Sequence, residues 1–102
     1  MSLEEIGVKI FAGSSSVSFA EKMCKHLGIE LGRSQTIHFS EGNTFVKIHE
    51  KVRDKDVYIV QSIGLRPNDD FMELLFLIDA FRRSSASSIT AIIPYFSYAK
   101  GD

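Results

Sequence analysis

Two apolar runs separated by a segment of helix length limit the possible folds of this chain more than any other feature. Residues 56–61 are mostly apolar, as in a strand buried inside a parallel sheet, and residues 89–93 predict a second buried strand. Strand–helix–strand units imply right-handed crossovers and parallel strands with helices packed on the faces of the sheet. We therefore expect an α/β fold built on a parallel sheet.

The segment between these runs has the signals of a helix. Asn68 is expected to cap it, with two acidic residues, Asp69 and Asp70, in its first turn and two arginines, Arg82 and Arg83, in its last. These charges complement the helix dipole at both ends. Nine of the eleven residues from 71 to 81 are apolar, which is too many for a single stripe. We therefore expect this helix to be covered on more than one side.

The first half of the chain predicts another strand and helix. Residues 8–11 favour a strand, and the helix after it has one apolar stripe formed by Ala20, Met23, Cys24 and Leu27. Gly28 is expected to end this helix in the left-handed conformation. A serine is expected to cap its start, either Ser15, Ser16 or Ser18, the last of which has capping-box spacing to Glu21.

Residues 36–39 and 44–48 favour strands, and the sequence between them, Ser-Glu-Gly-Asn at 40–43, is typical of a turn. This pair of strands is expected to form a β-hairpin inserted into the strand–helix pattern. The predicted order is therefore strand, helix, hairpin, strand, helix, strand.

Composition excludes several classes of protein. The 102 residues are enough for one domain with a modest core. A net charge of −1, from 12 basic and 13 acidic residues, gives no field that would attract nucleic acid or an anionic membrane. No apolar run approaches the ~20 residues that span a bilayer. The single cysteine cannot form an internal disulfide, so a reducing cytoplasm is the simpler expectation.

Three segments at the expected carboxyl ends of strands are candidate binding sites, because ligands of open α/β sheets bind there. Free N–H groups at 13–16 could hold an anion, although helix capping is the favoured interpretation of this segment. At 39–43, an aromatic ring beside Glu41 and Asn43 could stack on a planar base, or the segment is only a hairpin turn. The aromatic tail at 95–102, with a lysine and an aspartate, is either one wall of a site or a frayed terminus.

Other chemistry is not supported by the residues alone. The three histidines, His26, His38 and His49, have no metal-ligand spacing with one another or with Cys24. Cys24 lies on the apolar stripe and is interpreted as a core thiol. Without a resemblance to known proteins, the sequence predicts an α/β domain and does not specify a reaction.

Several segments, in this order, closely resemble the N-terminal domain of ribose-phosphate pyrophosphokinases, also called phosphoribosyl pyrophosphate synthetases. The resemblance runs from about residue 8 to the end of the chain. Two motifs are specific in combination, Asn-Asp-x-x-Met-Glu-Leu-Leu and Ala-x-Ile-Pro-Tyr-x-x-Tyr-Ala. The segments that carry it are 9–15, 39–43, 52–62, 68–75 and 89–99.

The resemblance implies a phosphoribosyltransferase-like fold with helices on both faces of the sheet. It also implies transfer of the diphosphoryl group of ATP to the 1-hydroxyl of ribose 5-phosphate, for nucleotide biosynthesis, in a magnesium-dependent homo-oligomer. Residues 1–7 are expected to be a leader, whose start is as readily a cloning addition as native sequence. Residues 8–102 would be a truncated N-terminal domain, inactive alone, with the second domain and most of the catalytic and magnesium-binding groups beyond residue 102.

The resemblance also implies roles for residues of this chain. Phe39 would stack on the adenine of ATP, with Glu41 and Asn43 at its amino edge, in the site of a neighbouring subunit. Asn43 stands where the family often has a glutamate. Lys100 stands where the family has an ATP-binding arginine and lacks its planar fork, and Gly101 replaces a glutamine. Of the family's regulatory phosphate site, Arg53 is kept and Lys51 replaces a serine.

The resemblance suggests what covers the apolar helix. Five residues are expected to pack on the sheet, namely Phe71, Leu74, Leu75, Ile78 and Phe81. Three others, Met72, Phe76 and Leu77, would meet the second domain or a neighbouring subunit, or be buried between sheet and loops. Because of the departures at 100 and 101, a non-catalytic, synthetase-associated regulatory subunit remains an alternative to the enzyme.

Overall fold

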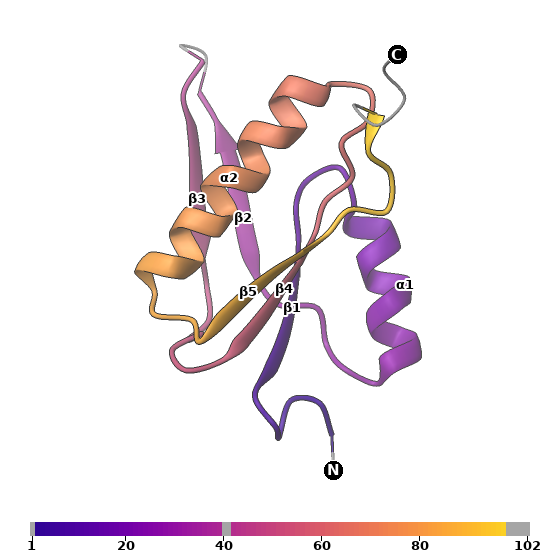
Figure 1. Ribbon diagram of the computed structural model, residues 1–102, viewed down its shortest axis with the longest axis vertical. Coiled ribbons are helices and arrows are strands. Elements are labelled where there is room, and N and C mark those ends of the chain that lie inside the picture. Colours follow the sequence, from indigo (N-terminus) through magenta and orange to yellow (C-terminus); the bar gives the residue numbers. More distant parts are fainter. Residues whose placement is uncertain (1, 40–41, 98–102) are drawn as a thin grey trace.

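The elements of the structure follow the predicted order. The computed structural model describes residues 2–39 and 42–97. The ATP-binding roles expected for Glu41 and Lys100 therefore concern residues outside the described part of the chain. The elements are β1 (Val8–Ala12), α1 (Val17–Leu27), β2 (Ser34–His38), β3 (Thr44–Ile48), β4 (Asp56–Val60), α2 (Pro67–Arg83) and β5 (Ser88–Ile92), as Figure 1 shows.

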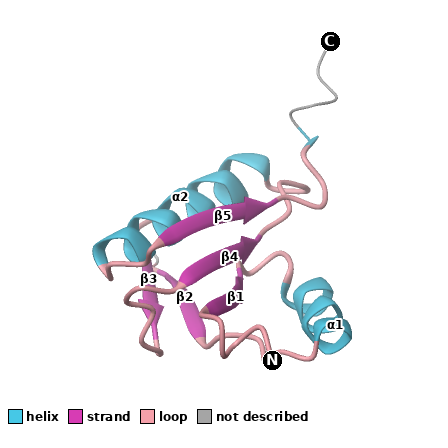
Figure 2. Ribbon diagram, turned by 60° about the horizontal axis from the view of Figure 1, so that its bottom comes forward, coloured by secondary structure: helices cyan, strands magenta, loops and turns pink. Residues whose placement is uncertain are grey.

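Strands β1, β4 and β5 form a parallel sheet with β4 in the centre. Alternate residues of β4 point to opposite faces: Val57 and Ile59 pack in a core cluster with α2, and Val60 packs in a second cluster with α1. The two helices therefore cover opposite faces of the sheet, as Figure 2 shows. This arrangement confirms the predicted fold class, including the helices on both faces.

The core is larger on the α2 face. There the Phe11 and Phe81 rings lie 4.6 Å apart, and both side chains are completely buried. Leu77 and Ile59 complete the contact between the helix and the sheet. Aromatic side chains of this size contribute most of the apolar area that stabilises such a layer.

The expectation that 89–93 is a buried strand is wrong in part. β5 pairs with β4 on one side, and Ser88, Thr90 and Ala91 are exposed. Ile89 and Ile92 are half-buried, one against each core cluster. An edge strand keeps only part of its surface under the helices, so its apolar composition does not by itself make it central.

The hairpin is confirmed as an insertion. β2 and β3 pair antiparallel in a sheet of their own, with Thr36 opposite Val46. One face of the hairpin packs beside α2, because Val46 and Ile48 contact the core cluster that contains Leu74 and Leu77. Phe45 lies on the other face and is half-exposed.

The predicted end of α1 is confirmed, and its predicted start is wrong. Gly28 ends the helix with φ of 71°, in the left-handed conformation. Ser16 occupies the N-cap position, but its side chain makes no capping hydrogen bond. Instead the Ser16 hydroxyl accepts a bond from the Ser62 N–H at 2.8 Å. Ser18 lies inside the helix, so the predicted capping box with Glu21 is not formed.

Helix α2 begins two residues earlier than its predicted cap allows, because Arg66 rather than Asn68 is the N-cap residue. Pro67 is the first helical residue, so Asn68 lies within the first turn. Proline suits this position because its missing N–H would have no partner within the helix.

The faces of α2 are assigned correctly in part. Leu74 and Phe81 pack on the core as predicted, and Ile78 is half-buried against it. Phe71 and Leu75 were expected on the sheet but are exposed. Leu77, expected to meet another surface or to be buried between sheet and loops, is fully buried in the core. The inner stripe follows residues 73, 74, 77, 80 and 81, which leaves Phe71, Met72, Leu75 and Phe76 exposed as a second apolar face.

Candidate functional site

A cavity of about 740 Å³ lies between the tip of the hairpin and the N-terminal half of α2. Its walls come from three parts of the chain: the loop after β1, the hairpin, and the start of α2. The residues that line it are Ser14, His38, Phe39, Gly42, Asn43, Thr44, Arg66, Asp69, Asp70, Met72, Glu73 and Phe76. The cavity lies at the carboxyl end of the parallel strands, where ligands of open α/β sheets bind.

Two of the four predicted ATP-binding residues line this cavity. The Phe39 N–H donates to the Asn43 carbonyl at 2.8 Å, which closes the turn and brings the two residues together. Gly42 has φ of 89°, a conformation that glycine adopts without strain. Phe39 is 50% exposed, so its side chain is accessible to a ligand. Glu41 and Lys100 lie outside the described residues.

Sequence reasoning missed the residues that reach the cavity from α2 and the hairpin strands. Arg66 supplies a cation just before α2, while Asp69 and Asp70 supply carboxylates in its first turn. His38 Nδ1 lies 3.2 Å from Thr44 Oγ1 across the hairpin. These residues share a wall only because the hairpin packs beside α2, a contact between segments distant in sequence. The alternation of the hairpin strands is the signal that identifies His38 and Thr44 as inward-facing.

Glu73 lies at the floor of the cavity and is 2% exposed. One carboxylate oxygen accepts hydrogen bonds from the Ser14 N–H at 2.8 Å and the Thr36 hydroxyl at 2.7 Å. The other accepts from the Ser14 hydroxyl at 2.5 Å and the Gln61 amide at 3.2 Å. A single buried carboxylate therefore joins the loop after β1, strand β2, the end of β4 and helix α2.

Gln61 extends this network and is completely buried. Its Oε1 accepts from the N–H and hydroxyl of Ser15, at 3.2 and 2.7 Å. Its Nε2 donates to the Asp70 carbonyl at 3.3 Å as well as to Glu73. A side chain built on Gly13 would overlap the Gln61 amide, so glycine is required where the two segments approach.

The candidate anion site at 13–16 is occupied by groups of the protein itself. The Ser14 N–H donates to Glu73, the Ser15 N–H to Gln61, and the Ser16 N–H to the Gly13 carbonyl at 3.1 Å. The loop thus binds an anion, but that anion is the Glu73 carboxylate. Helix capping, the other interpretation of this segment, is wrong as well, because its N–H groups bond to Glu73, Gln61 and Gly13 and no side chain caps α1.

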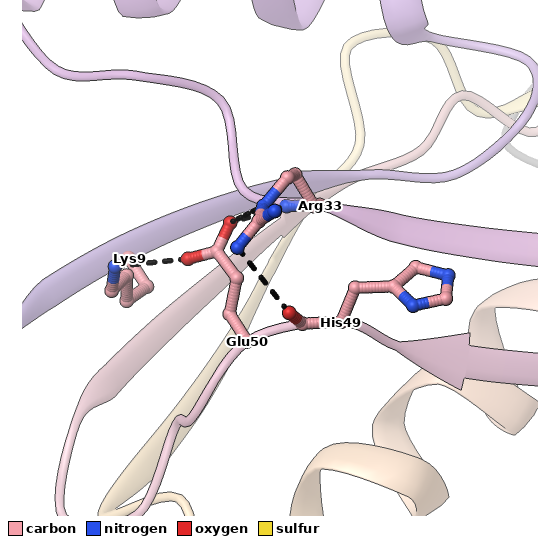
Figure 3. Close-up of polar contacts among 4 residues, drawn as sticks. All are labelled: Lys9, Arg33, His49 and Glu50. Atoms are coloured by element: carbon pink, nitrogen blue, oxygen red, sulfur yellow. Dashed lines mark hydrogen bonds and ion pairs between the residues drawn. The ribbon is translucent and has the colours of Figure 1, made fainter.

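A second polar cluster holds the base of the hairpin (Figure 3). Glu50 accepts a hydrogen bond from the Lys9 ammonium at 3.0 Å and one from the Arg33 N–H at 2.6 Å. Burial raises the pKa of Glu50, but these hydrogen bonds and the two positive charges outweigh it, so the pKa of this carboxyl is lowered. Arg33 also donates to the His49 carbonyl, at 3.5 Å.

Lys51 and Arg53, the predicted regulatory residues, are exposed and lie in the loop that leads to β4. This loop pairs with the turn before β5, since the Asp54 N–H donates to the Ser85 carbonyl at 3.0 Å. Both segments precede parallel strands, so they lie at the amino edge of the sheet. The structure therefore separates the predicted regulatory residues from the cavity at the carboxyl edge.

Cys24 lies in the core cluster beneath α1 and is 2% exposed. Burial raises the pKa of this thiol, which disfavours the reactive thiolate. The interpretation of Cys24 as a core residue is confirmed.

Magnesium, which the family resemblance implies, requires oxygen ligands that are free to coordinate it. Both oxygens of Glu73 already accept hydrogen bonds, and Asp70 Oδ2 accepts one from the Gly64 N–H at 3.0 Å. Within residues 2–39 and 42–97, no group of three or more His, Cys, Asp or Glu side chains could hold a metal ion. These residues therefore do not fit a magnesium site.

The helices of the described residues include none that is long and apolar enough to cross a membrane. The fold, a parallel sheet with a helix on each face and a cavity at its carboxyl edge, is of the phosphoribosyltransferase type. A purine phosphoribosyltransferase from Pyrococcus horikoshii matches it with a TM-score of 0.61 over 93% of this chain and 71% of that chain. At 19% sequence identity, this likeness concerns the fold alone.

Closer relatives identify the family. The model described as the N-terminal domain of ribose phosphate pyrophosphokinase matches residues 8–102, and the chain belongs to this family. Ribose-phosphate pyrophosphokinases of Campylobacter jejuni and Agrobacterium fabrum are 54% and 50% identical, over 94% and 93% of this chain. The crystal structure of phosphoribosylpyrophosphate synthetase from Mycobacterium smegmatis matches with a TM-score of 0.87 and 35% identity, over 92% of this chain and 32% of that chain.

The resemblance stated from the sequence is thereby confirmed. The chain spans 31% of the length of each of the two curated relatives.

Proposed function

We propose that this chain is the ATP-side domain of a ribose-phosphate diphosphokinase. The complete enzyme transfers the diphosphoryl group of ATP to the 1-hydroxyl of ribose 5-phosphate, and phosphoribosyl pyrophosphate serves nucleotide biosynthesis. The observation that carries this proposal is the family match over residues 8–102, together with 54% identity to the Campylobacter jejuni ribose-phosphate pyrophosphokinase.

The geometry of the hairpin tip supports a role in holding the nucleotide base. Phe39 is half-exposed at the hairpin tip, and an accessible aromatic ring stacks on a purine without desolvating a charge. Asn43 offers an amide that both donates and accepts hydrogen bonds beside it. Glu41 and Lys100 complete the proposed ATP-binding set, one at the edge of the base and one as a cation.

Further parts of the proposal concern the complete protein. Residues 8–102 form its N-terminal domain after a leader at 1–7, and the magnesium and catalytic groups belong to other parts of the enzyme. The enzyme is a cytoplasmic homo-oligomer in which the hairpin contributes to a neighbouring subunit's site. Lys51 and Arg53 take part in regulation by an anion at the amino edge of the sheet.

The test is a chimera in which this chain replaces the 96 matched residues of the Campylobacter jejuni relative. Phosphorus NMR is expected to show conversion of ATP and ribose 5-phosphate into AMP and phosphoribosyl pyrophosphate. A chimera that is folded and has the oligomeric state of its parent, yet converts neither substrate, would contradict the proposal.

Two phenylalanines of the hairpin provide a matched pair for the base-binding role. Phe39 and Phe45 are each 50% exposed, but of the two only Phe39 lines the cavity. Phe39→Ala is expected to raise KM for ATP about tenfold, the usual effect of losing one base–aromatic stack. Phe45→Ala is expected to leave KM for ATP unchanged. Equal effects of the two substitutions would show that Phe39 does not hold the base.

A further inference from the structure

The cavity has a feature that base binding does not explain. Its floor contains a buried carboxylate, Glu73, whose oxygens accept four hydrogen bonds from neutral donors. Burying a carboxylate is costly unless its hydrogen bonds are complete, and here two bonds reach each oxygen. The hydrogen bonds to Glu73 therefore have a structural role.

The Thr36 contact is the one that connects this carboxylate to the hairpin. Thr36 lies in the middle of β2, directly opposite Val46 of β3. At this level the hairpin is held to the body by an apolar contact through Val46 and by the 2.7 Å hydrogen bond from Thr36 to Glu73. Further toward the base, Ile48 packs on the core.

Closer to the tip than Thr36 and Val46, the inward-facing residues of the hairpin line the cavity instead of contacting the core. His38 and Thr44 are the next inward pair of the hairpin, and they line the cavity with Phe39 and Asn43. The tip therefore projects over a hollow, and its height above α2 depends on how the hairpin is held at Thr36 and Val46. A two-stranded hairpin is marginally stable by itself, so this attachment decides both its position and its order.

We propose that Glu73 is a positioning residue, which fixes the hairpin through Thr36 and thereby sets the position from which Phe39 and Asn43 contact the nucleotide base. This inference rests on the proposed function for its kinetic consequence. Its structural part, the attachment of the hairpin to α2 and to the loop after β1, is independent of any substrate.

Thr36→Val in the Campylobacter jejuni chimera removes the hydroxyl while keeping the branched shape of the side chain. Hydrogen exchange measured by mass spectrometry is expected to be about tenfold faster for the amides of residues 34–48, because the hairpin opens more often. Exchange in residues 56–60 is expected to stay unchanged. Unchanged exchange in the hairpin would overturn the proposal.

Steady-state kinetics distinguishes a role of Thr36 in positioning the hairpin from a role in the stability of the whole fold. The Thr36→Val chimera is expected to raise KM for ATP about tenfold, to change kcat by less than about threefold, and to leave KM for ribose 5-phosphate unchanged. A merely structural role would lower the active fraction and hence the apparent kcat, without changing KM for ATP. That second pattern would overturn the positioning role.

Two variants complete the design. Thr36→Ser keeps the hydroxyl and is expected to restore both hairpin exchange and KM for ATP. Thr90→Val makes the same chemical change on exposed β5 and is expected to alter neither. If the unsubstituted chimera lacks activity, the proposed function fails, whereas hydrogen exchange still decides whether Thr36 and Glu73 hold the hairpin.

Discussion

Two glutamates attach the hairpin to the rest of the molecule, and they do so by different means. Glu73 is buried at the floor of the cavity, and its bonds come from a backbone N–H, two hydroxyls and an amide. Glu50 lies at the base of the hairpin with its side chain 15% exposed, and it pairs with the charges of Lys9 and Arg33. One attachment uses neutral donors around a buried carboxylate, and the other uses ion pairs at the edge of solvent.

The two sets of bonds differ in how strictly they fix the position of the hairpin. A carboxylate with four neutral donors is satisfied only if all the elements that supply them stand in one arrangement, so the network selects a unique packing. A surface ion pair tolerates several side-chain geometries and is screened by salt. We therefore expect the Glu73 network to control the precision of the hairpin tip, and the Glu50 cluster to contribute a smaller free energy at its base.

The largest effect is expected for Glu73→Ala, which removes the acceptor of the Ser14 and Thr36 donors and one of the two acceptors of the buried Gln61 amide. The free energy of unfolding of the chain is expected to fall by about 3 kcal/mol, measured by urea denaturation. The adjacent cavity admits some water to these donors, which keeps the loss from being larger. A loss under about 1 kcal/mol would contradict the structural role given to this carboxylate.

Gly13→Ala tests the same hydrogen-bond network by adding a group that displaces Gln61, rather than by removing the Glu73 carboxylate. The added methyl group overlaps the buried Gln61 amide, which cannot move without losing its bonds to Ser15 and Glu73. We expect a loss of about 2 kcal/mol in the free energy of unfolding. Gly28→Ala is unsuitable as a control because its φ of 71° adds backbone strain. Ala12→Gly, at the neighbouring half-buried position, adds backbone freedom and removes a methyl group packed against the second core cluster, and it is expected to cost about 1 kcal/mol without disturbing Gln61.

Glu50→Ala is expected to have a smaller effect, about 1 kcal/mol, in the same urea experiment. It removes the partner of Lys9 and of the Arg33 N–H, but both groups can turn to water. Asp79→Ala, which breaks the exposed pair with Arg83, provides a control expected to cost under about 0.5 kcal/mol. A larger loss for Glu50→Ala than for Glu73→Ala would reverse the comparison between the two attachments.

The contrast also explains how much could be predicted from sequence. Local patterns were sufficient for the element order, the parallel sheet and the left-handed Gly28, because each depends on a few adjacent residues. The family motifs identified Phe39 and Asn43, and both line the cavity. The boundaries and faces of α2 were less predictable, since an almost uniformly apolar helix has no clear stripe to indicate that Leu77 is buried and Leu75 exposed.

The Glu73 network could not be predicted in this way. Its partners come from positions 14, 36 and 61, and nothing in the spacing of these residues indicates that they converge. One signal was present: Glu73 is the single charged residue between Phe71 and Ile78. A lone carboxylate in so apolar a segment indicates either a break in the buried face or a buried polar contact, and only the packing of the hairpin decides between them.

The smallest expected effect is the pH dependence of the stabilisation that Glu50 provides. The pKa of Glu50 is lowered from its ordinary value of 4.5, so the folded state binds this proton less readily than the unfolded state. The stabilisation from Glu50 is therefore fully present above about pH 5 and is lost as the pH falls through the folded-state pKa. Glu50→Gln lacks this titration. Urea denaturation of both proteins is expected to show a stability difference that is constant from pH 7 to about 5 and shrinks toward pH 3. Because all other groups titrate in both proteins, a difference that stays constant down to pH 3 would show that the ion pairs at Glu50 contribute nothing to the attachment at the base.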